Sequence, residues 1–439
     1  MTSTTEETNK NWNWYEKLAF RFFFILLIMH AEPWGWPASL PVVGDYLGLI
    51  IQPYYDFFDW LTGLVKKHIL HTDLIITPNG SGDTIDSWII YSLIFVISLA
   101  GTIIWTLTDR RNKRYDLLNT WLQVIIRYYL AKTMFVYGLI KLFPLQMPSP
   151  SLSQLITPLG EYSRMRLAWL FIGSSSSYQI FSGFCELLGG LLLLSRRTSS
   201  LGALILVTVL THVVALNVFF DIPVKLYSSI LLVMSIYLLV PNIRQFWSFF
   251  ILHIPVQLTF PGLNLKKKWK RVTRIALKTI FIAAFLMWPF YENMNTYSKG
   301  NLVWGAEKGV ISGYFNVEEF RVNGRNVMRT AADTFRWENL VFEDWNAGSI
   351  KSGVSQGTSL RYGRDYFDYK ADTIQNVLQI KFRKDSVRNF KLTYTLPDPD
   401  HLILSGRRGN DSLYVFLKKK NTGHFLLNNP LNWVQNSVP

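Results

Sequence analysis

Charged side chains inside apolar segments are the residues of this chain best placed to do chemistry. The stretch YLAKTMFVYGLIKLFP, residues 129–144, has the composition of a membrane span but carries Lys132 and Lys141, and Arg127 lies just before it. A later apolar segment, FSGFCELLGGLLLL, contains Glu186. A charge at the centre of a membrane costs at least about 2.5–3.5 kcal/mol, so such residues pair, face a protein interior or extend to the interface.

Helical spacing sorts the three cations. Arg127 and Lys141 are 14 residues apart, close to four full turns, so we expect them to share one face of a helix. Lys132 points away from both and lies near the middle of the segment. Lys141 lies near the end of the segment, where its side chain either extends to the outer interface or pairs with a carboxylate.

Glu186 is the predicted partner of one lysine. Gly189 and Gly190 share its helical face, and small residues let a second helix approach closely. We therefore expect a buried carboxylate, which either pairs with a cation or is protonated. The sequence leaves open whether Lys132 or Lys141 is the partner, and whether the pair serves chemistry or only holds two helices together.

The next apolar segment ends in THVVALNVFFDIPVK, residues 211–225, which contains His212 and Asn217. Histidine titrates near neutrality, so His212 beside Glu186 would form a proton-handling pair. A histidine bonded to neighbouring backbone is the alternative. The candidate catalytic residues are Lys141, Glu186 and His212, and the candidate cofactor-binding residues are Arg127, Lys132, Tyr137 and Asn217.

The composition predicts a multi-pass membrane protein. The 439 residues are 49% hydrophobic and only 17% charged, below the ~25% typical of soluble domains. The formal charge of +15 comes mostly from cations at the ends of apolar runs, which indicates orientation and anionic lipid rather than nucleic acid. The single cysteine, Cys185, excludes an internal disulfide and dithiol chemistry. We expect no metal site.

Seven spans are predicted from runs long enough to cross a ~30 Å hydrocarbon core as helix. They are residues 18–28 (extendable to residue 36), 88–107, 121–143, 178–194, 201–220, 226–240 and 275–291. Residues 244–260 are expected to lie in the interface. The basic clusters DRRNKR, SRRTSS and LKKKWKR fall on one side if the amino terminus is inside, as the positive-inside rule requires. The carboxyl terminus is then outside.

A second domain is predicted from residue 297 to 439, after a transmembrane domain of residues 1–296. Its apolar residues alternate, as in NVLQIKFRKD, and HLILSGRRGNDSLYVFLKKK predicts a hairpin with Leu402, Leu404, Val415 and Leu417 inward. This pattern predicts an all-β small barrel or sandwich. The opening GYFNVEEFRVNG, the hairpin and Trp433 resemble lipocalin-like barrels. The domain either encloses a ligand or serves as a cap that binds a partner.

The connector between the third and fourth predicted spans is long. It holds Tyr162, Met165 and Trp169 at the spacing of one helix face. We expect a lid over the outer end of the helices or an amphipathic anchor.

Residues 121–240 resemble the DoxX-like family of membrane proteins. The resemblance rests on YGLIKLFP, a loop, and then FSGFCELLGGLLLLSRRTSSLGALIL. The second motif has an acidic residue, a glycine pair, a run of leucines and a short basic turn, after which the next helix begins with small residues. It implies a four-helix membrane module, in some members a subunit of a quinone-linked oxidoreductase. It would place Lys141 and Glu186 at the family's polar positions. The additional spans and the β domain depart from that pattern.

YGLIKL followed by THVVALNVFFDIPVKLYSSILL also resembles the membrane region of vitamin K-dependent carboxylase-like proteins. That resemblance would make Lys141 a base and His212 a supporting group. Leu142 stands where that family usually has a second lysine, which weakens the likeness.

Three functions follow from these observations. The first is the membrane module of a quinone-linked oxidoreductase, in which Lys141 bonds a quinone carbonyl, Glu186 carries protons and a redox partner protein supplies electrons. The second is a non-enzymatic anchor or assembly factor that presents the β domain to partners. The third is a carboxylase-like enzyme that uses Lys141. In each case we expect an inner-membrane location, with the β domain periplasmic or extracellular.

Overall fold

The computed structural model divides the chain into two compact units. It describes residues 11–72, 82–109, 111–258, 266–299, 309, 311–328, 336–352, 362–383 and 389–428. The helical unit comprises Met1–Gln146 and Ser177–Asn295, and the barrel unit comprises Met147–Ser176 and Thr296–Pro439. The connector between α4 and α7 therefore packs with the C-terminal strands.

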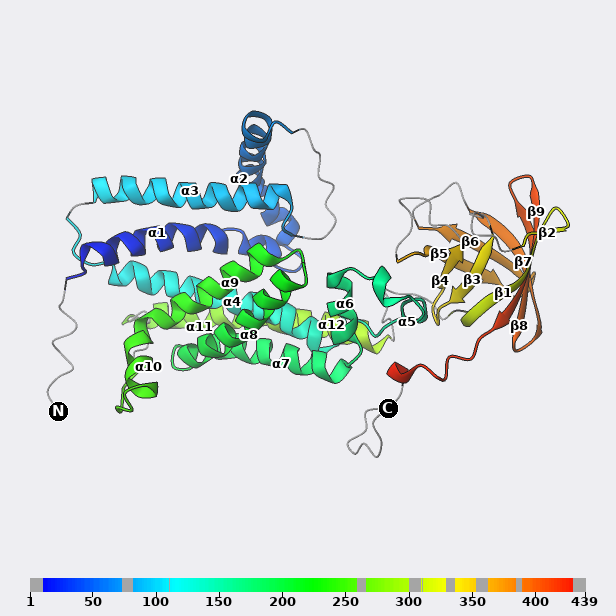
Figure 1. The fold of residues 1–439 in the computed structure, drawn as a ribbon. Helices are drawn as coiled ribbons and strands as arrows, with labels where there is room; N and C mark the ends of the chain where they lie inside the picture. Colours follow the sequence, from blue (N-terminus) through cyan, green and yellow to red (C-terminus); the bar gives the residue numbers. More distant parts are fainter. Residues whose placement is uncertain are drawn as a thin grey trace. The chain divides into compact units, whose positions relative to one another are not determined.

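The helical unit is built from long apolar helices (Figure 1). They are α1 (Trp14–Ala31), α2 (Gly44–Val65), α3 (Ile85–Thr108), α4 (Asp116–Leu142), α7 (Ser176–Leu193), α8 (Ser199–Phe219), α9 (Lys225–Leu239), α10 (Ile243–Phe250), α11 (Lys268–Ile282) and α12 (Trp288–Ser298). Short 3₁₀ or π turns η2 (Trp36–Ser39), η3 (Lys66–Leu70), η5 (Val240–Asn242) and η6 (Ala283–Met287) extend or join them.

Five helical segments of the described chain are long and apolar enough to cross a membrane, which indicates a membrane protein. They are Trp14–Ser39, Ile85–Thr108, Ser199–Phe219, Lys225–Phe250 and Lys268–Ser298. The predicted spans at residues 121–143 and 178–194 form the helices α4 and α7, but neither is among the five. Their polar residues lower the mean hydropathy of both helices: α4 contains three cations, and α7 contains Gln179 and Glu186. The expected interfacial helix at residues 244–260 is shorter, since α10 ends at Phe250 and continues α9 through η5.

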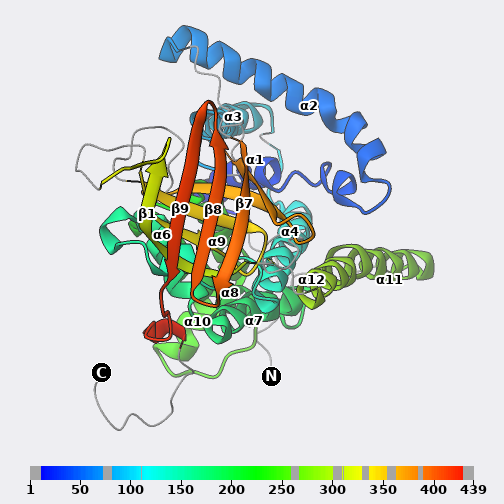
Figure 2. The same cartoon turned by 90° about the vertical axis from the view of Figure 1, so that its right-hand side faces the viewer.

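Helix α2 was not predicted from the sequence. It runs across α1 and α3 rather than alongside them (Figures 1 and 2). Leu49, Ile50 and Trp60 are exposed along one stripe, and Asp45 and Asp59 lie on a neighbouring stripe. The acids interrupt the apolar run in the sequence, so a search for continuous apolar stretches does not find this helix.

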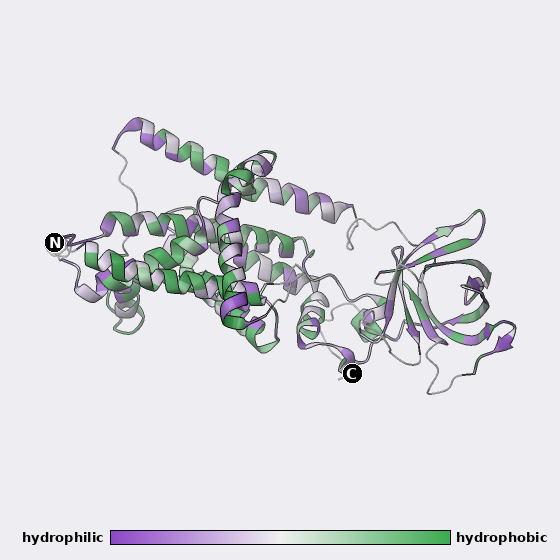
Figure 3. Ribbon diagram, turned by 90° about the horizontal axis from the view of Figure 1, so that it is seen from above, coloured by the Kyte–Doolittle hydropathy of each residue, from purple (hydrophilic) through white to green (hydrophobic). Residues whose placement is uncertain are grey.

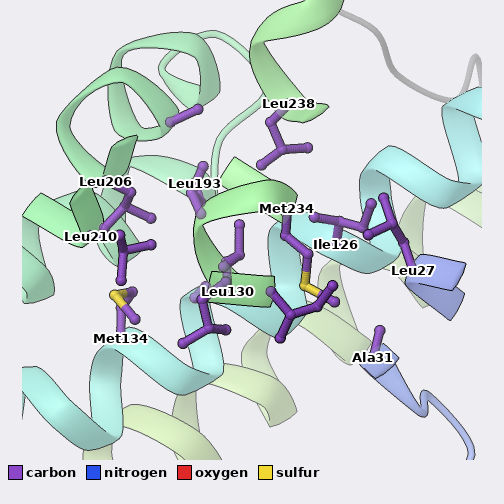
Figure 4. Close-up of a cluster of buried hydrophobic side chains, with 14 of the residues drawn as sticks. Leu27, Ala31, Ile126, Leu130, Met134, Leu193, Leu206, Leu210, Met234 and Leu238 are labelled. Carbon is purple, nitrogen blue, oxygen red and sulfur yellow. The ribbon is translucent and has the colours of Figure 1, made fainter. Parts of the chain in front are cut away.

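The core of the helical unit lies around α4. Leu130 and Met134 of α4 are fully buried among side chains from the other helices (Figure 4). The neighbours labelled there include Leu27 and Ala31 of α1, Leu193 of α7, Leu206 and Leu210 of α8, and Met234 and Leu238 of α9. Helix α4 is thus surrounded by protein along much of its length, which is how it tolerates cations.

The C-terminal strands form a closed antiparallel barrel of eight strands. They are β1 (Gly313–Val322), β3 (Trp337–Phe342), β4 (Ala347–Ser352), β5 (Asp365–Asp372), β6 (Val377–Phe382), β7 (Phe390–Asp398), β8 (His401–Arg408) and β9 (Asp411–Lys419). Each strand pairs with the next, and β1 closes the barrel on β9. The two-residue strand β2 (Arg325–Asn326) pairs only with the end of β1. Figure 2 shows β7, β8 and β9 side by side.

Side chains fill the barrel interior. Phe320, Phe342 and Phe367 are fully buried there, as expected because an eight-stranded barrel is just wide enough to be filled by its own side chains. The strands alternate hydrophobic and hydrophilic residues, whereas the helices are apolar over longer stretches (Figure 3). The predicted hairpin is confirmed: Leu402 pairs with Leu417, and Leu404 pairs with Val415. Trp433 lies outside the described residues.

The connector is held to the barrel by buried polar contacts. It forms α5 (Leu152–Leu155), the turn η4 (Leu159–Glu161) and α6 (Arg164–Gly173). The Glu343 carboxylate accepts hydrogen bonds from the backbone N–H groups of Leu152 and Ser153, both at 3.0 Å, and from the Ser153 hydroxyl. Met165 and Trp169 lie within α6, and Tyr162 precedes it. The sequence gives no indication of this contact, because a single glutamate directly after a strand is usually a solvated surface charge.

We expect Glu343→Gln to destabilise the barrel unit by about 2–4 kcal/mol. Hydrogen bonds to a charged group contribute about 1.5–3 kcal/mol each, and the NH₂ group of the glutamine would face the N–H and O–H donors of the connector. The measurements are chemical denaturation and limited proteolysis of the connector. Glu318→Gln, which removes an exposed carboxylate from β1, is the matched control. Equal stability of the two variants would contradict a structural role for Glu343.

Candidate functional site: a charged helix crossing and a pocket

Helices α4 and α7 cross with their backbones in contact. A Cβ atom added to Gly183 would lie 2.6 Å from the carbonyl oxygen of Gly138, and one added to Gly138 would lie 2.9 Å from that of Gly183. Gly190 is similarly close to Met134, at 3.0 Å from its Cβ. Of the two glycines predicted to admit a close helix, Gly190 therefore faces α4, whereas a Cβ atom added to Gly189 would clash with the Leu206 side chain of α8.

This crossing brings Lys141 and Glu186 together, each three residues after its crossing glycine. Lys141 Nζ lies 2.6 Å from Glu186 Oε1 and 2.7 Å from Oε2, so the ammonium group donates to both carboxylate oxygens. Glu186 is 2% exposed and Lys141 is 9% exposed. Of the two pairings left open by the sequence, the structure has Lys141–Glu186. Lys141 does not extend to the interface.

Tyr137 completes the surroundings of this pair. The Lys141 ammonium lies 5.6 Å from the centre of the Tyr137 ring, one turn earlier on α4. An aromatic face attracts a cation at this distance. The ammonium group is thus held by two carboxylate oxygens and a ring face.

The other two cations of α4 behave as helical spacing predicts. Arg127 shares the Lys141 face and also contacts α7, where its Nε and Nη2 donate to the carbonyl oxygen of Leu193 at 3.0 and 2.7 Å. Lys132 points elsewhere: it donates to the Ser39 hydroxyl at 2.9 Å and lies over the Phe285 ring at 5.1 Å. Neither one contacts Glu186.

His212 and Asn217 are not brought to the pair. His212 is on the exposed side of α8, and no hydrogen bond or ion pair given for the described residues joins it to Glu186 or Lys141. Asn217 is buried and donates to the Ser228 hydroxyl at 3.0 Å, which links α8 to α9. Of the seven candidate residues, the structure therefore gathers Lys141, Glu186 and Tyr137.

A separate pocket of about 830 Å³ lies in the helical unit between α1, α4 and α9, and we call it the α1–α4–α9 pocket. Its apolar lining includes Trp12, Phe20, Phe23, Val233 and Ile236, and its polar and charged lining includes Glu16, Arg114, Asp116, Asn119, Gln123 and Tyr237. This volume is within the range of about 300–1,000 Å³ found for small-molecule sites.

The polar end of the α1–α4–α9 pocket is an amide and phenol cluster. Tyr237 donates to Asn119 Oδ1 at 2.8 Å, and Gln123 Nε2 lies 3.4 Å from the same oxygen. No hydrogen bond within the described residues is given for the amide nitrogen of Asn119 or the amide oxygen of Gln123. Neither residue was predicted from the sequence, although their i, i+4 spacing at the start of α4 puts them on one helix face.

A buried arginine fixes the wall of this pocket. Arg21 of α1 donates to the Tyr115 hydroxyl through Nε at 3.1 Å and Nη2 at 2.7 Å, and to the Asp109 carbonyl. The Tyr115 ring stacks on Phe20, which lines the pocket. Hydrogen bonds from Asn112 and Tyr115 lower the pKa of Asp109 to about 2, so this carboxylate stays ionised at physiological pH.

Among the described residues, no group of three or more His, Cys, Asp and Glu side chains is arranged to hold a metal ion. The polar groups of the α1–α4–α9 pocket suit an organic ligand that forms hydrogen bonds.

Comparison with known proteins gives a partial likeness. No protein-family model matches the chain, and no solved structure matches it. A curated relative from Bacillus subtilis (strain 168), described as "Uncharacterized protein YwoB", is 39% identical over 127 residues, which are 28% of this chain and 79% of that protein. The name of this relative states no activity. Because the likeness covers more than three quarters of YwoB, the chain belongs to the same family as YwoB.

Proposed function

We propose that this protein is a DoxX-like multi-pass membrane protein that binds a lipid quinone, or a neutral lipid of similar chemistry, in the α1–α4–α9 pocket. The pocket itself is the observation that carries the proposal: aromatic and aliphatic walls lead to an amide and phenol end. A quinone has two carbonyl oxygens that accept hydrogen bonds and an isoprenoid chain that suits apolar walls.

The charges of the pocket favour a neutral head group. Its lining holds one cation, Arg114, against two carboxylates, Glu16 and Asp116, and Arg114 is paired with Asp116 at 2.5 Å. An anionic head group would find no free cation among these residues. The amide nitrogen of Asn119 is a donor for a carbonyl oxygen.

The proposed setting is a bacterial inner membrane with the amino terminus inside and the barrel periplasmic or extracellular. The basic residues 111–114, 196–197 and 266–271 support this orientation, because cytoplasmic loops are rich in Lys and Arg. In this setting the protein is the membrane module of a quinone-linked oxidoreductase system. A separate redox partner would exchange electrons with the bound quinone.

The pocket variant Ala19→Trp should lose most of the lipid that copurifies with the wild-type protein. Ala19 lines the pocket and is exposed, so an indole fills the site at little cost in folding. Tyr237→Phe should weaken binding by about 2- to 10-fold, the equivalent of one hydrogen bond. The measurement is organic extraction of the detergent-purified protein and mass spectrometry of the extract.

Tyr227→Phe is the matched control for Tyr237→Phe. Tyr227 is also on α9 and is not among the pocket residues. Its hydroxyl lies 3.5 Å from the Thr133 hydroxyl and also hydrogen-bonds with Tyr129, so Tyr227→Phe likewise removes a phenol hydrogen bond, but outside the pocket. Quinone absent from the wild type, or retained equally in Ala19→Trp, would overturn the proposal.

The second candidate is a non-enzymatic anchor that presents the barrel to partners. Two observations favour it: the barrel interior is filled by its own side chains, and Lys141 is fully occupied by Glu186 and Tyr137. Because Lys141 is already paired with Glu186 and Tyr137, a carboxylase-like role for Lys141 has the least support of the three functions. If no lipid copurifies and barrel variants alone abolish function in cells, the anchor becomes the working function.

A further inference from the structure

Four cations from three separate segments of the helical unit gather near the end of α7. Arg127 belongs to α4, Arg196 follows α7, and Arg274 and Lys278 are one turn apart on α11. The charges of Arg127 and Arg196 repel each other, and Lys278 is repelled by both Arg127 and Arg274. We call these four residues the basic cluster.

The packing of α4 against α11 holds the basic cluster together. The rings of Tyr128 and Phe281 meet edge to face with centres 4.9 Å apart. Tyr128 follows Arg127 directly, and Phe281 lies one turn after Lys278, so this contact brings Arg127 and Lys278 to the same level along the two helices. Tyr128 interacts electrostatically with both Arg127 and Arg274.

No carboxylate balances the basic cluster within the described part of the chain. None of the ion pairs found there includes any of its four members. Arg127 is 7% exposed, and it uses Nε and Nη2 for the Leu193 carbonyl. Its Nη1 donates to no other described residue. A cation at a helix C-terminus is favourable, which explains Arg127 alone but not three further cations beside it.

We propose that the basic cluster binds the phosphate group of an anionic membrane lipid. A guanidinium group presents paired N–H donors that match phosphate oxygens, and the lysine adds a point charge. A phosphate would relieve the repulsion among these cations, of which Arg127 is buried, Lys278 is half-buried, and Arg196 and Arg274 are exposed and open to a ligand.

Lipid is favoured as the source of the phosphate by the surface of α11. Val272, Ile275, Leu277 and Ile280 are exposed on this helix, interleaved with Arg274 and Lys278. The segment Lys268–Ser298 is also apolar enough to cross a membrane. A basic site between helices with apolar surface beside it is the arrangement that binds anionic lipid head groups.

The test compares two charge-matched variants of the full-length protein in nanodiscs. Arg274→Gln/Lys278→Gln removes two cations of the cluster, and Lys270→Gln/Arg271→Gln removes two exposed cations of the same helix outside it. Thermal unfolding is measured in phosphatidylcholine with and without phosphatidylglycerol. We expect phosphatidylglycerol to raise the Tm of the wild type and of the control variant, and most of this shift to be lost in the cluster variant.

Three outcomes would overturn the proposal. The first is no shift in the wild type, and the second is an equal loss of the shift in both variants, which would mean unspecific surface charge. The third outcome comes from the same Tm measurement in detergent: if inorganic phosphate raises the Tm as much as phosphatidylglycerol does, the ligand is a soluble phosphate. Native mass spectrometry checks the expected result independently, because phosphatidylglycerol should stay bound to the wild type and dissociate from the cluster variant.

Discussion

Glu186→Gln should lower the free energy of unfolding of the helical unit by about 3–5 kcal/mol, the usual cost of removing one partner of a buried ion pair. The physical reason is that Lys141 would remain buried at 9% exposure with no carboxylate to balance it. Thermal and chemical unfolding of the detergent-purified protein measure the effect. Asp59→Asn removes an exposed carboxylate from α2 and should change stability by less than about 0.5 kcal/mol.

The double variant Lys141→Met/Glu186→Leu separates a structural role from a chemical one. Replacing a buried ion pair by apolar residues is often neutral or stabilising, so the double variant should recover most of the stability lost in Glu186→Gln. Recovered stability with normal activity in cells would mean that the pair only holds α4 against α7. If Glu186→Gln is as stable as the wild type yet inactive, the pair takes part in chemistry and our structural interpretation is wrong.

Gly183→Ala should destabilise the helical unit by about 1–3 kcal/mol or more, as expected for overpacking a close contact. The new methyl group would lie 2.6 Å from the Gly138 carbonyl oxygen and 2.7 Å from the Leu142 backbone nitrogen. Backbone atoms cannot turn aside as a side-chain end can, so α4 and α7 must separate. Separation would also lengthen the Lys141–Glu186 contact, and the two losses should add only partly because they share one crossing.

Gly63→Ala gives the opposite sign and serves as the control. Gly63 lies in α2, where an added Cβ meets nothing within 4 Å, so the gain in helix propensity should stabilise the protein by up to about 1 kcal/mol. Both substitutions add one methyl group to a helical glycine, and only the surroundings differ. If both glycine variants gain stability, the close α4–α7 crossing does not exist in the protein.

Much of the charged crossing could be predicted from the sequence because it depends on local periodicity. The 14-residue spacing puts Arg127 and Lys141 on one face, and both contact α7 in the structure. The glycines of α7 indicated close contact with a helix; Gly190 contacts α4, and Gly189 contacts α8. The choice between Lys132 and Lys141 was not predictable, since it depends on where along their lengths the two helices cross.

The sequence by itself determined the kinds of element, the apolar core helices and the alternating strands of the barrel, because these follow from periods of 3.6 and 2 along the chain. Only the tertiary structure decided which distant residues meet. Glu343 holds the connector, Asn119 and Tyr237 form the end of a pocket, and four cations gather near the end of α7. These contacts join residues of separate elements that are about 70 to 190 positions apart, and no local pattern encodes such distances. They are set by how helices and strands pack, where the energy of each contact depends on partners that the neighbouring sequence does not specify.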